Sequence, residues 1–344
     1  VPVYGAAAVL TLNGRGELAA VKATDSKLLD RLPNLTYVLA LGSAGGAAEI
    51  PDEMLDFQFA TVKNMFSQMG MELTDELMER IEQLAKGMED EITEVQFVGG
   101  GAPEGSGLFG LACVLKCNNA ANAKKLLAEC VEVGNELIRQ TIAQKDENFA
   151  QLKISYTEGA ETVTGASVDT IEVTHPEMAE MTEEDLAEVA KVFGETKIRC
   201  FVAVADPKTL VVTLGGGKAF LTKALDAAQK GGTVLADPSV AGALKYMPEK
   251  PALLAMFSAG NLLDLVNQGI RKMDPENPGL PVMFQSKDAI AIGMGVDGPA
   301  AHAVLYVPSA VVKDVVGAVM SFMMARTAMP PGPMPPPTPP GEDF

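Results

Sequence analysis

The two histidines are the first residues of this chain that could do chemistry. His175 precedes a proline at the end of a predicted strand, and His302 lies inside a predicted strand. Neither has a cysteine, an aspartate or the other histidine at the spacing of a metal-ligand set. A lone histidine can act as a general base, but that role requires a positioned nucleophile, which the sequence does not indicate. We therefore interpret both side chains as structural.

A glycine-rich segment, GGGK at 215–218, lies between a predicted strand and a predicted helix, as a phosphate-binding loop does. The full motif requires glycine at position 212 and a hydroxyl residue at position 219, but the chain has Val212 and Ala219. The loop is then too short to wrap phosphates, and it lacks the hydroxyl ligand for Mg²⁺. The segment therefore predicts a flexible strand-to-helix turn and no nucleotide cofactor.

The four cysteines leave two interpretations open. Cys113 and Cys117 are four residues apart on one predicted strand, which places them about 13 Å apart, too far for a mutual disulfide. Cys113 and Cys200 lie in apolar strands, where a buried thiol is typical. Cys117 at a strand end and Cys130 on the next helix could meet, because that helix is expected to fold back on its sheet. The alternatives are four free thiols or a disulfide between Cys117 and Cys130.

The chain has 18 methionines, and three of them, Met320, Met323 and Met324, lie on the last predicted helix. Clustered thioethers can bind copper, but this spacing is more typical of a core or a subunit face. We expect neither a metal nor any other cofactor.

Charge and hydropathy exclude several classes of partner. The 344 residues carry a formal net charge of −18, which argues against binding to nucleic acid or to anionic lipid. No run of about 18 uncharged apolar residues is present, so we expect no transmembrane segment. The sequence does not identify a small-molecule ligand.

A recurring unit organises the chain. Residues 92–138 and 288–324 each read as strand, turn, strand and helix, with apolar residues on one helix face. A similar unit occupies 198–232, and the weakest copy occupies 3–32. One such unit cannot bury its apolar side alone, so neighbouring units must share sheets or stack.

These units predict an α+β fold with mainly antiparallel sheets covered by helices, in two repeated lobes. The first lobe is 1–148 and contains a helical insert at 52–91; the second lobe is 149–329. Residues 330–344 form a proline-rich tail.

The tail is expected to be an extended polyproline II segment, because proline lacks an N–H and has a fixed φ. It is either a solvated spacer or a strap that docks on a partner. The candidate docking residues are Pro330, Pro331, Pro333, Pro335, Pro336, Pro337, Pro339 and Pro340.

Three segments, at 28–42, 198–266 and 290–316, resemble a family of uncharacterised exported bacterial proteins with a domain of unknown function. The first contains LLDRLPNLTYVLALG and the last contains HAVLYVPSAVVKDVV. The resemblance implies a repeated α+β fold and an extracytoplasmic location, whether periplasmic, secreted or at the cell surface. It offers no catalytic residues to transfer.

We therefore expect a non-catalytic extracytoplasmic protein that serves as a scaffold or assembly subunit, through self-association or a protein partner. The alternative is a ligand-binding module with an apolar groove between the two lobes. An enzyme is the least favoured of the three.

Overall fold

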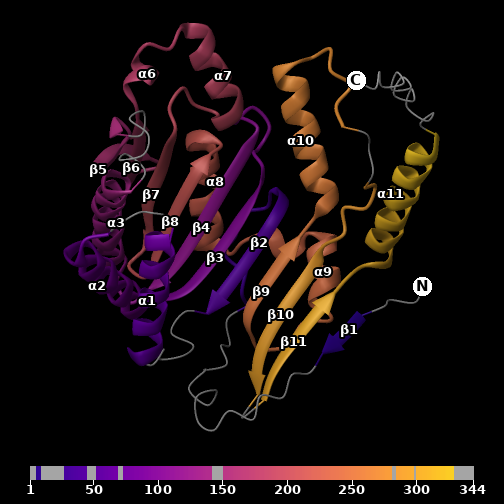
Figure 1. The fold of residues 1–344 in the computed structure, drawn as a ribbon, viewed down its shortest axis with the longest axis horizontal. Helices are drawn as coiled ribbons and strands as arrows, with labels where there is room; N and C mark the ends of the chain where they lie inside the picture. The colour runs from indigo at the N-terminus through magenta and orange to yellow at the C-terminus, as the bar shows by residue number, and fades with distance from the viewer. Residues whose placement is uncertain are drawn as a thin grey trace, which may run out of the picture.

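The structure is a computed structural model, and it describes residues 5–8, 27–44, 52–68, 73–141, 150–280, 284–297 and 300–328. Within these residues the chain forms one open antiparallel sheet of eleven strands (Figure 1), in the order β1-β11-β10-β9-β2-β3-β4-β8-β7-β6-β5. The strands are β1 (Gly5–Ala8), β2 (Thr36–Ala44), β3 (Ile92–Gly101), β4 (Phe109–Cys117), β5 (Lys153–Val163), β6 (Ala166–Thr174), β7 (Arg199–Asp206), β8 (Thr209–Gly215), β9 (Pro251–Phe257), β10 (Ile290–Asp297) and β11 (Ala300–Tyr306).

Helices cover both sides of this sheet, and the predicted α+β class is confirmed. They are α1 (Asp52–Gln68), α2 (Asp75–Glu91), α3 (Ala120–Gln140), α6 (Pro176–Ala179), α7 (Glu183–Phe193), α8 (Gly217–Lys230), α9 (Pro238–Leu244), α10 (Ala259–Met273) and α11 (Ser309–Ala328), with a 3₁₀ turn η2 (Val234–Ala236). Local side chains fix where several of them begin. Thr182 and Asp185, for example, form a capping box at the start of α7.

The recurring unit is present three times. The hairpins β3–β4, β7–β8 and β10–β11 are each followed by a helix, as predicted for 92–138, 198–232 and 288–324. The fourth predicted copy, at 3–32, lies largely outside the described residues; of its strands only β1 is described, paired with β11.

The two predicted lobes contribute alternating blocks of strands to the sheet. The central strands β2, β3 and β4 come from 1–148, and second-half strands flank them on both sides, because β2 pairs with β9 and β4 pairs with β8. Residues 1–148 and 149–329 therefore share one sheet. The lobe boundary itself stays a prediction.

The main core lies on the face of the sheet that α8 and α9 cover. Val98, Val114 and Val211 point from the strands toward Phe220 and Leu221 of α8, and all five side chains are buried. The opposite face has only partial cover. There α3 packs over β4, β7 and β8, and α2 packs on α3 in a smaller cluster.

Gly100 of β3 has the least space for a side chain among the described glycines of the strands, and its neighbour there is β2. A β-carbon at Gly100 would lie 2.2 Å from the Thr36 carbonyl oxygen and 2.7 Å from the Tyr37 α-carbon, both backbone atoms. The pairing register shifts between Tyr37 and Leu39, next to this contact. At Gly101 the nearest atom would be 3.6 Å away, which is ordinary contact.

We predict that Gly100→Ala lowers the free energy of unfolding by about 1–3 kcal/mol, since the backbone of β2 must move to admit the methyl group. Gly101→Ala is the matched control and should be close to neutral. Urea unfolding followed by circular dichroism measures both variants. Equal stability of the two would contradict the packing described for β2 and β3.

Candidate functional site

The part of the opposite face that α3 leaves uncovered is apolar. Leu41, Ala255, Ile292 and Leu305 form one row across β2, β9, β10 and β11. Ile292 and Leu305 are each 44% exposed, whereas Leu254, which points to the other side of the sheet, is buried. The usual alternation of a half-solvated sheet is therefore missing here, because both faces of these strands are apolar.

Helix α10 adds to this surface because polar side chains lie on its buried side and apolar side chains on its exposed side. Its buried side carries Asn261, whose amide donates to the Tyr37 carbonyl at 2.8 Å, and Asn267, whose side-chain oxygen accepts from the Leu280 amide. Leu262 and Val266 are exposed instead. We name the exposed side chains of this region the open apolar face; they are Leu39, Leu262, Val266, Ile292, Met294 and Leu305.

Helix α11 is apolar on most of its circumference and is attached at one stripe. Val311 is buried, and the Asp314 carboxylate accepts from the amides of Gln285 and Ser286 at 2.9 and 2.7 Å. A helix that is hydrophobic all round is normally a buried helix. Its exposed apolar side chains are Val312, Val315, Val316, Val319, Met320 and Met323, which are 44–57% exposed.

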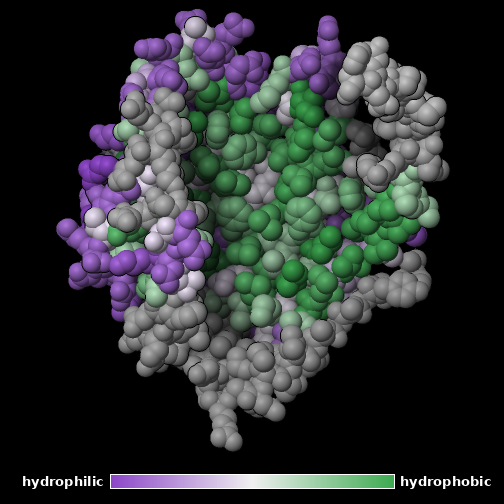
Figure 2. Space-filling model, in the orientation of Figure 1, coloured by the Kyte–Doolittle hydropathy of each residue, from purple (hydrophilic) through white to green (hydrophobic). Residues whose placement is uncertain are grey.

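Figure 2 shows the hydrophobic side chains gathered in a hollow over β2, β9, β10 and α10, beside the hydrophilic surfaces of α2, α6 and α7. Together with α11, the open apolar face presents on the order of 1,000 Å² of apolar side chain, against roughly 300–600 Å² for the largest patch of a typical monomer. A surface of this size is typical of an interaction site.

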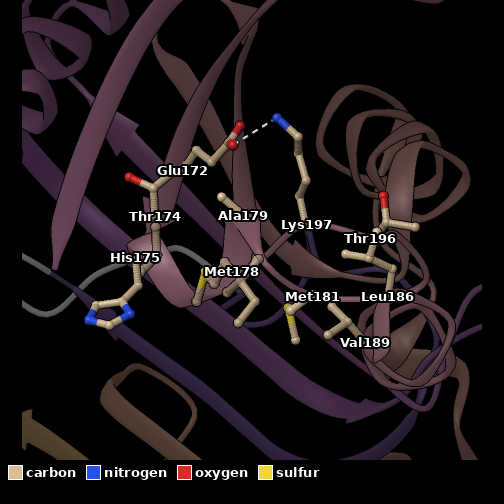
Figure 3. A pocket seen from close by; sticks show the side chains of 12 residues that line it. Glu172, Thr174, His175, Met178, Ala179, Met181, Leu186, Val189, Thr196 and Lys197 are labelled. Atoms are coloured by element: carbon tan, nitrogen blue, oxygen red, sulfur yellow. Dashed lines mark hydrogen bonds and ion pairs between the residues drawn. The ribbon is translucent and has the colours of Figure 1, made fainter. Parts of the chain in front are cut away.

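A separate pocket lies between the end of β6 and the helices α6 and α7 (Figure 3). It has a volume of about 390 Å³, and an ion pair of 2.8 Å between Glu172 and Lys197 lies beside it. The apolar side chains that line it are Val173, Met178, Ala179, Met181, Leu186, Val189 and Ile198. No residue of α7 is buried, so this pocket is an incompletely filled junction between helix and sheet.

The histidines take positions in regular structure. His175 is the N-cap of α6, where its Nδ1 accepts from the Glu177 amide at 3.3 Å, and its side chain lines the α6–α7 pocket. His302 lies in β11 opposite Gly295 of β10. Within the described part of the chain, no three His, Cys, Asp or Glu residues are placed to hold a metal ion.

The GGGK segment forms the predicted strand-to-helix turn. Gly215, Gly216 and Gly217 all have positive φ, of 71°, 70° and 58°, a conformation that favours glycine. The Lys218 ammonium lies 2.9 Å from the Glu161 carboxylate of β5. The segment thus ties α8 to the sheet.

The four cysteines are free, so the Cys117–Cys130 disulfide is not formed. Cys117 is buried at the end of β4, and its thiol donates to the Lys208 carbonyl at 3.5 Å. Cys130 lies three turns along α3, in the cluster between α3 and α2. Burial raises the pKa of Cys113 and of Cys117 to about 11, which makes these thiols poor nucleophiles near neutral pH. The candidate docking prolines at 330–340 lie outside the described residues.

One buried ionic cluster joins α3 to the outer strands. The Asp169 carboxylate of β6 lies 2.7 Å from the Lys124 ammonium and accepts from the Gly159 amide at 2.9 Å and from the Tyr156 hydroxyl. Burial alone would raise the pKa of Asp169, but these three donors together hold it below its ordinary value. The carboxylate is fully engaged, and its role is to hold β5 and β6 against α3.

Comparisons with known proteins identify no family. No family model matches the chain, and no curated protein matches it. Its structure is distantly similar to that of TP0453, a Treponema pallidum protein of uncertain function. Crystal form III has a TM-score of 0.33 at 10% identity, covering 86% of this chain and 100% of that one. Crystal form I has 0.30 at 8% identity, covering 87% and 99%.

A likeness this distant carries no argument about function. The resemblance to exported bacterial proteins therefore stays a prediction. No helix within the described ranges is both long enough and apolar enough to cross a membrane.

We predict that Asp169→Asn lowers the free energy of unfolding by about 3–5 kcal/mol at pH 7, because Lys124 loses its buried partner. The pKa of Asp169 is lower in the folded state, so its contribution is present at neutral pH and is lost as the pH falls through the folded pKa. The wild-type and Asp169→Asn stabilities should converge in acid.

The matched control is Glu158→Gln, since Glu158 is 82% exposed and lies 3.8 Å from the same ammonium. It should change stability little. Urea unfolding at a series of pH values tests both variants. An Asp169→Asn variant as stable as wild type at pH 7 would show that the cluster does not hold these strands.

Proposed function

We propose that this protein is a non-catalytic, extracytoplasmic assembly subunit that binds a folded protein partner through the open apolar face and α11. The observation that carries the proposal is the exposure of large apolar side chains on strands whose other face packs against the main core. Ile292, Met294 and Leu305 are 44–46% exposed, although their neighbours in sequence complete the core.

The energetics favour an occupied surface. Covering on the order of 1,000 Å² of apolar surface gains roughly 25 kcal/mol before the entropic costs of association are subtracted. The large negative charge of the chain keeps it soluble while this surface is free. The binding of a folded partner with an apolar surface of its own is therefore energetically favourable here.

The shape of the surface favours a protein over a small ligand. The open apolar face spans four strands and one helix, and it is open to solvent rather than enclosed. Small-molecule sites enclose most of their ligand, whereas protein partners bind extended surfaces of this size. The extracytoplasmic location is the part of the proposal that rests on the sequence resemblance alone.

We predict that a photo-reactive amino acid in place of Met294 gives a discrete covalent protein adduct in the producing cell. The same group in place of Thr162, an exposed residue of the far edge strand β5, should give none. Adding Ile292→Glu to the Met294 probe should abolish the adduct, because a charge in the centre of the face must be desolvated on binding. Adduct yields that are equal at the two positions, or unchanged by Ile292→Glu, would contradict the proposal.

A second candidate function, ligand binding, is favoured by the pocket between α6 and α7. Its apolar lining and its Glu172–Lys197 ion pair (Figure 3) fit a small molecule with an aliphatic body and one polar end. This site differs from the expected groove between two lobes, since it lies at one end of the sheet.

We predict that decanoate, added as a probe, shifts the methyl signals of Met178 and Met181 in a sample labelled with ¹³C at its methionine methyl groups. Leu186→Trp should remove these shifts by filling the pocket, and Met294 should report no change. Shifts absent at Met178 and Met181, or retained in Leu186→Trp, would rule out this site for aliphatic ligands.

A further inference from the structure

We propose that the partner on the open apolar face is a second copy of this chain, whose α11 packs across β10 and β11 of its neighbour. The inference deepens the proposed function and rests on it. The two copies would exchange α11 reciprocally, so that one two-fold axis relates two identical contacts.

The internal repeat supplies the main argument. In the first unit two residues, Asn118 and Asn119, connect β4 to α3; in the last unit two residues, Val307 and Pro308, connect β11 to α11. The units therefore match in strands, connection length and following helix. They differ in what the helix covers, as does the middle unit, whose α8 packs on the main-core face of the sheet.

Helix α3 covers β4 of its own unit and the strands β8, β7 and β5 beyond it. Its Ala120 and Ala123 are buried against Leu115 of β4 and against Val202 and Leu210 of the next strands. The surface on β10 and β11 on this same side of the sheet is exposed at Ile292, Met294 and Leu305. In the described part of the chain no helix covers this side of β10 and β11, whereas α11, which follows β11, keeps six large apolar side chains exposed.

Helix α11 carries the side chains that such a site requires. Val312, Val316, Val319 and Met323 recur at steps of four, three and four residues, so they form one stripe along the helix. Each is at least 45% exposed. The stripe and the uncovered strands are complementary in hydropathy, because both are apolar.

The attachment of α11 prevents it from covering its own sheet. Asp314 accepts from the amides of both Gln285 and Ser286, and Val311 is buried at the base of the helix. Figure 1 shows α11 rising beside the sheet rather than across it. If α11 folded back onto β10 of its own chain, both hydrogen bonds of Asp314 would break. The same helix can cover β10 of a second copy with both hydrogen bonds intact.

The proposed contact is formed by apolar side chains from both elements. Each copy would contribute Ile292, Met294 and Leu305 of the sheet and the four side chains of the α11 stripe, which are 44–57% exposed. Charge opposes the association, since each chain carries −18, while the side chains that define the contact are uncharged. Salt should therefore strengthen the dimer by screening the repulsion between copies.

The test begins with sedimentation equilibrium of the full chain. We expect a monomer–dimer equilibrium whose dissociation constant falls at least tenfold as the ionic strength rises from about 0.01 M to about 0.15 M, where the Debye length shortens from roughly 30 to roughly 8 Å. Val316→Glu should raise the dissociation constant at least a hundredfold, and Thr162→Glu, which adds the same charge on β5, should not. Circular dichroism verifies that both variants fold.

Cross-linking then identifies the contact. A Met294→Cys chain is mixed with a differently tagged Val316→Cys chain and treated with a short bismaleimide; the wild-type chain with its four native cysteines is the blank. We expect a covalent heterodimer that joins the two new cysteines. A strict monomer, a dimer insensitive to Val316→Glu or weakened by salt, or a mixture of the two variants that gives no cross-linked heterodimer would overturn the inference.

The two proposals fail separately. If the Met294 photo-probe captures a different protein while the purified chain stays monomeric, the assembly function stands and the second-copy partner is excluded. If the photo-probe captures nothing, both are excluded.

Discussion

The structure depends on one constraint: both faces of an apolar sheet must be removed from water, and the described helices cover one face fully and the other only in part. On one side α8, α9 and residues 28–35 bury a continuous core that runs from β5 to β10. On the other side α3 covers β4, β8, β7 and β5. What remains, over β2, β9, β10 and β11, is the surface to which we assign the function. The same constraint applies to α11, the last described helix, which is apolar but keeps most of its side chains outside the core.

Much of the architecture could be predicted from the sequence because it is encoded locally. Alternating and continuous apolar runs separated by glycine turns gave the antiparallel hairpins at 92–117 and 290–306. The apolar face repeated at steps of three and four residues predicted the helix α3. The missing glycine at position 212 correctly indicated that GGGK is a turn. Each of these signals lies within about twenty residues of the feature it specifies.

The site depends on pairings that the sequence does not record. An apolar strand such as 251–257 looks the same whether one or both of its faces are covered, so the exposure of the open apolar face could not be inferred. The strand order, in which β2 meets β9, joins residues more than two hundred positions apart. The contact between Lys124 and Asp169 is non-local in the same way. The Cys117–Cys130 disulfide stayed open as an alternative because the distance between the two thiols depends on how α3 packs against β4. The sequence does not record that packing.

The central claim is that the open apolar face and α11 are covered when the protein works. Oxidative footprinting tests this directly, because methionines occur both inside and outside the surface. Met294, Met320 and Met323 are 46–57% exposed in the single chain, and Met65 on α1 is 50% exposed. The account predicts that the first three resist oxidation in protein taken from its native assembly and react after dilution, while Met65 reacts in both samples. Equal oxidation of Met294 and Met65 in the native assembly would contradict it.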